Sequence, residues 1–354
     1  MAAAVSNGWQ FYLTLLLVYL GVDIIACLGL NIQLGLAGVM DFAFIIFQAV
    51  GAYVYAIFTL GPASSGLGQG AGGESYLWGT SWPFPLPFVM AALAGVVLAF
   101  FCAAVVLPRL RGDYEAMAFL VISLIASGIA TNQVGLVNGA NGLYGIPQPL
   151  SSVLNLPAVQ YDWFYVGLTA MICVLVWLLT RRITTSPMGR LLRAVRENEP
   201  AARALGKDAT KARMFAFLVG GGLGGLSGAV LVAFITAWAP SSWGYAETFV
   251  YITAIVIGGF GNDLGVLVGV LLVPILFGEL VRFLPAYGRS TWIEAAQLMA
   301  YALLTLLFLW FRPQGLVPER RQRYPAGGEI PLDPGGVPLA RRLRPRLGSA
   351  GRLR

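Results

Sequence analysis

Long apolar stretches separated by short polar ones dominate the chain between Gln10 and Phe311. A helix needs about 20 apolar residues to cross about 30 Å of hydrocarbon. Two stretches are unusual, because 247–261 is short for a crossing and 31–60 is long, with polar residues in its first third. The pattern predicts an all-α polytopic membrane protein with about eight to ten transmembrane helices, some of them broken. The predicted spans are 10–30, 31–60, 86–108, 114–135, 163–180, 212–238, 247–261, 264–284 and 292–311.

The basic residues orient these spans. Nineteen of the 23 lysines and arginines fall within Arg181–Arg213 and Arg312–Arg354. Because basic residues next to spans stay on the cytoplasmic side, both stretches are expected there. An even number of crossings must then separate them, which holds if Gly261–Asp263 turns on the cytoplasmic side. The amino terminus is outside if 31–60 crosses once and inside if that stretch is a broken pair.

The same charges divide the chain into two predicted domains. Residues 1–311 are expected to form the transmembrane domain, with the loop 181–213 as its cytoplasmic element. Residues 312–354 are rich in Pro, Gly and Arg, so they cannot bury a core and are expected to form a disordered cytoplasmic tail. The tail would orient the chain and meet anionic lipid headgroups. Nucleic acid is not an expected partner, because no basic module with interleaved aromatic residues is present.

Composition argues against catalysis. The chain is 58% hydrophobic and 11% charged, whereas soluble domains carry about a quarter charged residues. It has no histidine, and its three cysteines lie in apolar runs without metal-ligand spacing. No catalytic residue, metal site or cofactor is therefore predicted. The carboxylate pairs Asp113/Glu115 and Glu197/Glu199 are expected to be solvated or to face helix dipoles.

The cytoplasmic loop contains a helical signature at Ser186–Gly206. Ser186 can cap a helix that starts with Pro187, Pro200 can end that helix and start another, and Gly206 is a natural stop. Residues at helical spacing form one apolar stripe, namely Met188, Leu191, Leu192 and Val195. Two short helices are therefore expected, either lying on the bilayer and neighbouring loops or docking into a groove of a cytoplasmic partner.

Polar residues interrupt the glycine-rich stretch Gly29–Tyr53, where Asn31, Gln33, Asp41 and Gln48 occur. Polar groups at membrane depth are costly unless they are paired or hydrated. These residues are expected to line or shape a substrate path. The alternative is a glycine-kinked packing helix whose amides are satisfied internally.

Glycines mark two further features. Gly220, Gly224 and Gly228 recur at every fourth residue, which predicts a helix face for close packing. Glycines and Asn-Asp also break the apolar run at 257–269. The broken segments 29–53 and 257–278 are loosely alike, which suggests an internal repeat of the kind found in transporters.

The order and spacing of these motifs resemble the permease subunits of branched-chain amino acid ABC importers, of the LivM type, in a wider family that includes urea, amide and sugar importer permeases. The resemblance runs through GLNIQLGLAGVMDFAF, LRGDYEAMAF, NGANGLYGIP, SPMGRLLRAVRENEPAARALG, GGGLGGLSGA, IGGFGNDLGVLVG and FRPQGLVPER, over most of residues 28–318. One departure is Phe44, which stands where the family often has histidine and leaves the substrate open. Urea or a short amide is the alternative cargo.

The resemblance implies an ATP-driven importer in a bacterial or archaeal cytoplasmic (inner) membrane. Its expected partners are a second homologous permease subunit, two cytoplasmic ABC ATPases and an extracytoplasmic solute-binding protein. By the match to the family's coupling region, contact with an ATPase is expected at Arg193, Arg196, Glu197, Asn198, Ala201, Leu205 and Gly206. The rival class is an ion-coupled secondary transporter, for which Asp23 and Asp41 are the main candidate ionisable residues within the membrane.

Overall fold

The structure is a computed structural model that describes residues 2–61, 76, 79–110, 112–282, 290–312 and 314–319. Helices dominate these residues, and within them β-pairing is limited to the isolated bridges Tyr76–Val137 and Leu143–Trp238. The predicted all-α polytopic membrane fold is confirmed. The predicted tail from residue 320 onward and most of the linker 61–85 lie outside the described residues.

Six helical segments in the described residues are long and apolar enough to cross a membrane. They are Gly8–Leu36, Leu86–Val106 (α3), Asp113–Asn132 (α4), Ala158–Thr185 (α7), Ala209–Ile235 (α10) and Asp263–Leu280. Shorter apolar helices, α2 (Phe44–Thr59) and the stretch Ala295–Phe311 of α14 (Ser290–Phe311), lie among them. Together with α11 (Tyr245–Gly258), these elements follow the order of the predicted spans.

The predicted span 31–60 is divided in the structure. Asn31–Leu36 continues α1 (Ala2–Leu30) as the π-helical turn η1, and α2 begins only at Phe44. The second break is the turn at 259–262 between α11 and α12 (Asp263–Val270), and the span that follows it continues through the π-helical η4 (Leu271–Phe277) and α13 (Gly278–Arg282). Pro274 lies inside η4, and it lacks the backbone N–H that a regular helix needs there.

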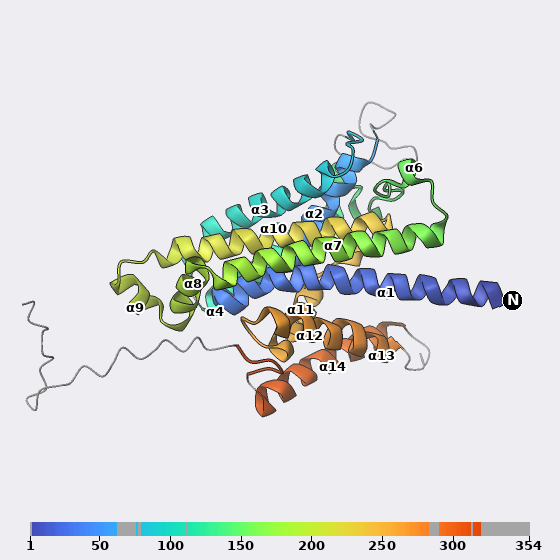
Figure 1. Cartoon of the computed structure of the whole chain (residues 1–354). Helices are drawn as coiled ribbons and strands as arrows, with labels where there is room; N and C mark the ends of the chain where they lie inside the picture. Colours follow the sequence, from blue (N-terminus) through green and yellow to red (C-terminus); the bar gives the residue numbers. More distant parts are fainter. Residues whose placement is uncertain are drawn as a thin grey trace, which may run out of the picture. The chain divides into compact units, whose positions relative to one another are not determined.

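The loop helices lie at one end of the bundle. Figure 1 shows α8 (Pro187–Glu197) and α9 (Glu199–Ala204) at the end opposite the start of α1. The smaller elements α5 (Val134–Val137), α6 (Ser151–Leu154), η2 (Gly139–Asn141) and η3 (Pro240–Ser242) form connections between the spans. If α8 is cytoplasmic, α1 therefore starts outside, which is the arrangement expected when 31–60 crosses once.

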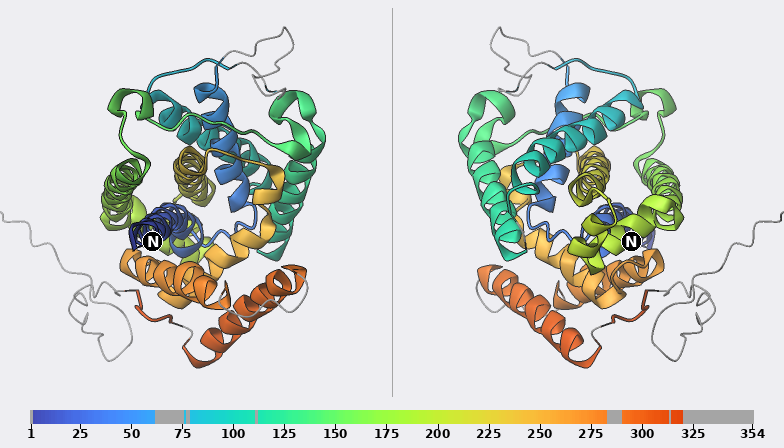
Figure 2. Two further views of the ribbon diagram at one scale, coloured as in Figure 1. Left: turned by 90° about the vertical axis from the view of Figure 1, so that its right-hand side faces the viewer. Right: turned by 90° about the vertical axis from the view of Figure 1, so that its left-hand side faces the viewer.

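The most buried span is α10, which lies in the middle of the bundle when the helices are viewed end on (Figure 2). It packs on α3, α2 and α1. Its glycines face these neighbours: a Cβ at Gly228 would overlap the carbonyl oxygen of Gln48, and one at Gly220 would overlap the side chain of Gln33. Gly224 faces the ring of Phe44 and the Cβ of Phe47. The predicted small-residue face thus lies where α10 meets α1 and α2.

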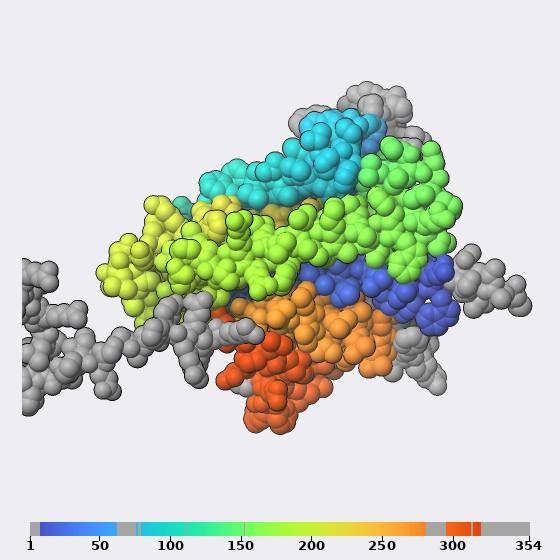
Figure 3. Space-filling view, in the orientation of Figure 1, coloured from blue at the N-terminus to red at the C-terminus, as the bar shows by residue number. Residues whose placement is uncertain are grey.

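The outward faces are apolar. α7 lies across the face seen in Figure 3, and α14 forms its lower edge. Leu175 and Leu179 of α7, and Met299 and Trp310 of α14, are exposed. Such large apolar surfaces on the sides of a bundle suit contact with hydrocarbon.

One charged pair departs from the sequence prediction. Glu115, expected to be solvated, is only 1% exposed and pairs with Arg213 at 2.7 Å. The two side chains join the first turn of α4 to the first turns of α10. The solvated alternative is wrong for Glu115, because the helix periodicity of α4 turns its side chain toward the core, where it pairs with a cation 98 residues away in the sequence. The dipole alternative holds to the extent that Glu115 lies in the first turn of α4.

Candidate functional site

The two loop helices begin at side-chain caps. Ser186 Oγ accepts a hydrogen bond from the Gly189 N–H (3.3 Å) at the start of α8, and Asn198 Oδ1 accepts one from Ala201 N–H (3.0 Å) at the start of α9. α9 therefore begins one residue before Pro200, because a proline is accommodated in the first turn of a helix. Gly206, with φ of +75°, follows the end of α9 in the left-handed conformation that glycine favours.

The predicted apolar stripe of α8 faces the bundle. Leu192 and Val195 are buried, and α8 packs on α7, α10 and η1. Away from this packed side, the exposed residues of the loop include Arg190, Glu197, Asn198, Ala201, Arg203, Leu205 and Gly206. Leu205 is 80% exposed although it is a large apolar residue. Five of the seven predicted ATPase-contact residues, Glu197, Asn198, Ala201, Leu205 and Gly206, thus lie on a free surface of this chain.

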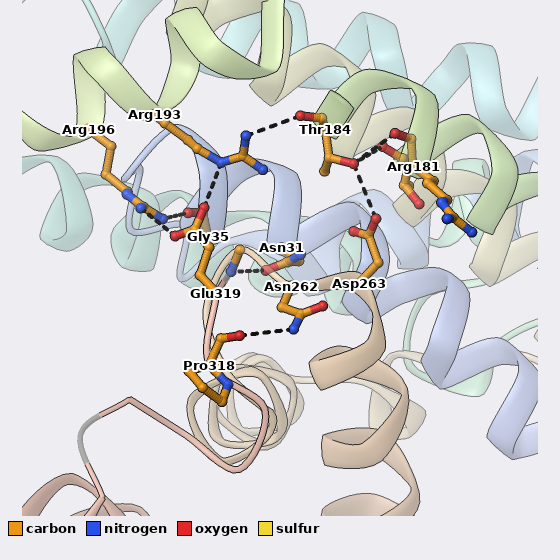
Figure 4. A network of polar contacts seen from close by, with 12 residues as sticks. Asn31, Gly35, Arg181, Thr184, Arg193, Arg196, Asn262, Asp263, Pro318 and Glu319 are labelled. Atoms are coloured by element: carbon orange, nitrogen blue, oxygen red, sulfur yellow. Dashed lines mark hydrogen bonds and ion pairs between the residues drawn. The ribbon is translucent and has the colours of Figure 1, made fainter. Parts of the chain in front are cut away.

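The other two, Arg193 and Arg196, turn inward toward Glu319 (Figure 4). Arg193 Nε lies 2.6 Å from one oxygen of the Glu319 carboxylate, and Arg196 Nη2 lies 2.7 Å from the other. All three side chains are about a quarter exposed. Part of each arginine's hydrogen-bonding capacity is therefore used within the chain.

Each arginine has a second anchor. Arg193 Nη1 donates to the carbonyl of Thr184 at the end of α7 (3.2 Å), and Arg196 Nη1 donates to the carbonyl of Gly35 in η1. Thr184 Oγ1 in turn donates to a carboxylate oxygen of Asp263 at the start of α12 (3.3 Å). The contacts around α8 therefore reach both broken spans.

The two breaks also contact each other directly. Asn31, at the start of η1, accepts a hydrogen bond from the backbone N–H of Gly261 (3.0 Å). Gly261 lies in the turn between α11 and α12. The segments 29–53 and 257–278, singled out as alike in sequence, thus have their breaks side by side at the end of the bundle that carries α8.

The predicted path residues are buried between helices of this one chain. Gln33 Nε2 donates to the carbonyl of Phe217 (3.1 Å), and Asp41 Oδ1 accepts from the N–H of Ala43 (2.8 Å), just before α2. All four path residues also have one buried polar atom without a hydrogen-bond partner, which holds for Gln33, Asp41, Asn31 and Gln48 alike. In this conformation the four residues therefore shape the interior of the bundle, and their half-satisfied groups mark it as a polar seam.

Tyr251 extends this seam to a third helix. Its hydroxyl lies 3.1 Å from Gln48 Oε1 and 3.3 Å from Asp23 Oδ1, and so bridges α11, α2 and α1. Phe44, the departure from the family pattern, packs edge-on against Tyr251 with 6.3 Å between ring centroids. Phe44 thus fills the core beside the polar seam.

Sequence reasoning missed several of these residues. Glu319 was seen only as part of FRPQGLVPER, and neither Thr184 nor Tyr251 was singled out. The partners that join them to other helices lie 79 to 228 residues away in the sequence, so no local spacing links these pairs. One available signal was that Glu319 is a lone acidic residue within a basic segment.

A bundle of membrane-length helices, with two broken spans meeting under a basic two-helix loop, defines a multi-pass transport permease. The chain belongs to the family of the branched-chain amino acid transport system / permease component, whose family model matches residues 12–311. It is a permease of this transport family.

Individual relatives agree with this assignment. The chain is 29% identical to the high-affinity branched-chain amino acid transport system permease protein LivM of Escherichia coli, over 90% of this chain and 72% of the relative. It is also 29% identical to the probable LivM permease of Methanocaldococcus jannaschii, over 87% of this chain and 94% of the relative. The autoinducer 2 import system permease LsrC of an Enterobacter strain is 25% identical over 60% of this chain. No solved structure gives a significant match.

Proposed function

We propose that the chain is the membrane-spanning subunit of an ATP-driven importer that carries branched-chain or related amino acids. A solute-binding protein delivers the substrate, a second homologous permease completes the path, and two cytoplasmic ABC ATPases supply the energy. The family and the two LivM relatives support this proposal. The membrane would be the cytoplasmic membrane of a bacterium or archaeon.

The observation that carries the proposal is the construction of α8 and α9. Their apolar side is packed on the bundle, while Glu197, Ala201 and Leu205 are exposed at its basic end. A short amphipathic element with a rigid base and an exposed Leu205 suits docking into a groove of a partner. Closure of the ATPases would then push on α8, and the chain's part is to favour one transport state when that happens.

The residues of the polar seam are proposed to line the substrate path. Asn31 and Gln33 lie on η1, the break that contacts α8, while Gln48 lies on α2 and Asp41 just before it. A movement of η1 would change which of their groups are paired. The unpartnered amide groups suit a zwitterionic amino acid, and they suit urea or a short amide as the second candidate cargo.

Uptake by vesicles tests the function. Right-side-out vesicles containing the chain with its companion subunits are assayed for uptake of radiolabelled leucine and urea, with and without ATP enclosed on the cytoplasmic side. ATP-dependent leucine uptake that survives an ionophore is expected. ATP-dependent uptake of urea alone would assign the second cargo, and uptake that collapses with the ionophore but survives ATP depletion would identify a secondary transporter instead.

A further inference from the structure

We propose that Gln314–Glu319, the segment after α14, is a coupling strap that carries movement of α8 to both broken spans. The inference rests on the proposed function, because the movement of α8 is the one that ATPase closure would impose. Nothing in the family comparison assigns a role to this segment, since the family match ends at residue 311. Three sets of contacts, which join the strap, α8, η1 and the α11–α12 turn, together form a closed circuit.

The first set fixes the strap to the turn between α11 and α12. The backbone N–H groups of Leu316 and Val317 donate to the carbonyls of Ile257 (2.8 Å) and Gly258 (3.0 Å). Asn262 Nδ2 donates back to the carbonyls of Val317 and Pro318, at 3.3 and 3.2 Å. Because the hydrogen bonds run in both directions, the strap and the turn are expected to move together.

The packing at this junction is close enough to exclude a side chain. Gly259 has φ of +125°, and a Cβ there would overlap the carbonyl oxygen of Val317. A residue other than glycine would strain the backbone and push the strap away. The end of α11 is thus built to receive the strap.

The second set fixes the strap to α8. The carboxylate of Glu319 receives Arg193 on one oxygen and Arg196 on the other. One carboxylate held between two guanidinium groups forms charge-assisted hydrogen bonds, which are stronger than neutral ones. The partial burial of all three side chains reduces the solvent screening that weakens pairs on an open surface.

The third set closes the circuit through the first broken span. Arg196 donates to the carbonyl of Gly35, and Asn31 accepts from the N–H of Gly261. Both Asn31 and Gly35 belong to η1 (Figure 4). Gly261 belongs to the turn that holds the strap. A displacement of α8 therefore pulls on η1 through Arg196 and on the α11–α12 turn through Glu319.

The two breaks are suitable receivers of such movement. η1 is a π-helical turn, so it interrupts the regular hydrogen-bonding pattern of the α-helix that it continues. The α11–α12 turn joins the end of α11 to the start of the second broken span. Small shifts at such points can reorient the helical segments on either side of them.

Hydrogen–deuterium exchange on the purified full-length chain in lipid nanodiscs tests the circuit without any partner. Glu319→Gln removes the charge and keeps the shape, and Glu329→Gln makes the same change in the tail as a matched control. Glu319→Gln is expected to raise amide exchange roughly threefold to tenfold in α8 and in residues 259–263, while Glu329→Gln changes neither. An increase confined to residues 314–319 would overturn the proposal.

A double-variant cycle shows whether the pair acts as a unit. Arg196→Gln alone is expected to raise exchange in the same two regions, and Arg196→Gln with Glu319→Gln is expected to add little to either single change. Fully additive effects would mean that the two side chains act separately, which contradicts the circuit.

Transport then tests coupling in the assembled importer. Glu319→Gln is expected to lower leucine uptake per ATP hydrolysed several-fold, with the content of ATPase subunits unchanged. A parallel loss of ATPase content would instead assign Glu319 to docking and overturn the proposal. If the unaltered importer shows no ATP-driven uptake, the proposed function fails, and the exchange measurements still decide whether the circuit exists.

Discussion

Arg196 and Glu319 lie 123 residues apart in the sequence and form a 2.7 Å ion pair at the basic end of the bundle. The same guanidinium contacts the carbonyl of Gly35, so one side chain joins the loop helix, the segment after the last helix and the first broken span. Replacing both Arg193 and Arg196 by glutamate would therefore disturb internal contacts as well as any ATPase surface. Docking is better tested at Leu205, whose side chain is exposed.

Asp41→Asn tests the substrate-path proposal. An asparagine oxygen can still accept the hydrogen bond from the Ala43 N–H, while the unpartnered carboxylate oxygen becomes an NH₂ group. Uptake is expected to fall roughly tenfold, because an acceptor oxygen facing the seam is replaced by a donor while the hydrogen bond to Ala43 is kept. Uptake is compared with the yield and melting temperature of the purified protein. Equal losses in uptake and yield would show that Asp41 serves folding.

Gly228→Ala tests the close packing of α10. The added Cβ would overlap the Gln48 carbonyl oxygen, and overpacking of this kind costs about 1–3 kcal/mol. Gly128→Ala on α4 is the matched control, because a Cβ there meets nothing within 4 Å. Unfolding in detergent is expected to show a loss of stability for Gly228→Ala alone. Equal behaviour of the two variants would contradict the packing seen around α10.

The buried pair of Glu115 and Arg213 predicts that a single variant is less stable than the corresponding double variant. Arg213→Met leaves the Glu115 carboxylate without its cation, which is expected to cost about 3–5 kcal/mol. Adding Glu115→Gln to Arg213→Met is expected to restore part of that stability, because the unpaired charge is removed. Thermal unfolding of the two variants checks this order. A double variant less stable than Arg213→Met would contradict it.

Asp208, outside the membrane-spanning segments, predicts a dependence on pH at the start of α10. The Lys211 N–H donates to its carboxylate, and this bond, followed by the Lys211 ammonium at 3.1 Å, lowers the pKa of Asp208 below its ordinary value. A carboxylate whose pKa is lowered in the folded protein stabilises the fold at every pH above its ordinary pKa of about 3.9. This stabilisation is lost as the pH falls through the lowered pKa of the folded protein.

Amide exchange measured from pH 6 down to about pH 3 checks this cap. Protection at the first turn of α10 is expected to fall at the acid end in the native chain. In Asp208→Asn the cap does not titrate, so the protection there should not depend on pH in the same way. A native chain whose first turn behaves like that of Asp208→Asn would refute the assignment.

Features that depend on the spacing of residues within one segment were predictable from the sequence. The two helices of the loop follow from Ser186, Pro200 and Gly206, and the close packing of α10 follows from the spacing of Gly220 and Gly228. These features depend on helix geometry within one segment, which the sequence states directly. The boundary near residue 31 was less accurate, since a π-helical turn carries no distinct spacing.

The contacts between distant segments were not predictable. Glu115 read as a solvated first-turn carboxylate until Arg213 was placed beside it. Arg193 and Arg196 read as a docking surface, and their use within the chain depends on Glu319, more than a hundred residues away. Such pairs are selected by the packing of whole helices, so a single sequence does not indicate which charges meet.

The most direct test of the account is the accessibility of Leu205. Leu205→Cys is made with Cys27, Cys102 and Cys173 replaced by alanine, and a membrane-impermeant maleimide is applied to intact cells and to inside-out vesicles. Labelling is expected only in inside-out vesicles, and the ATPase subunits are expected to protect position 205 from labelling when they are present. Labelling of Cys at position 205 in intact cells would place α8 and α9 on the outer side and contradict the central claim that they form the cytoplasmic docking element.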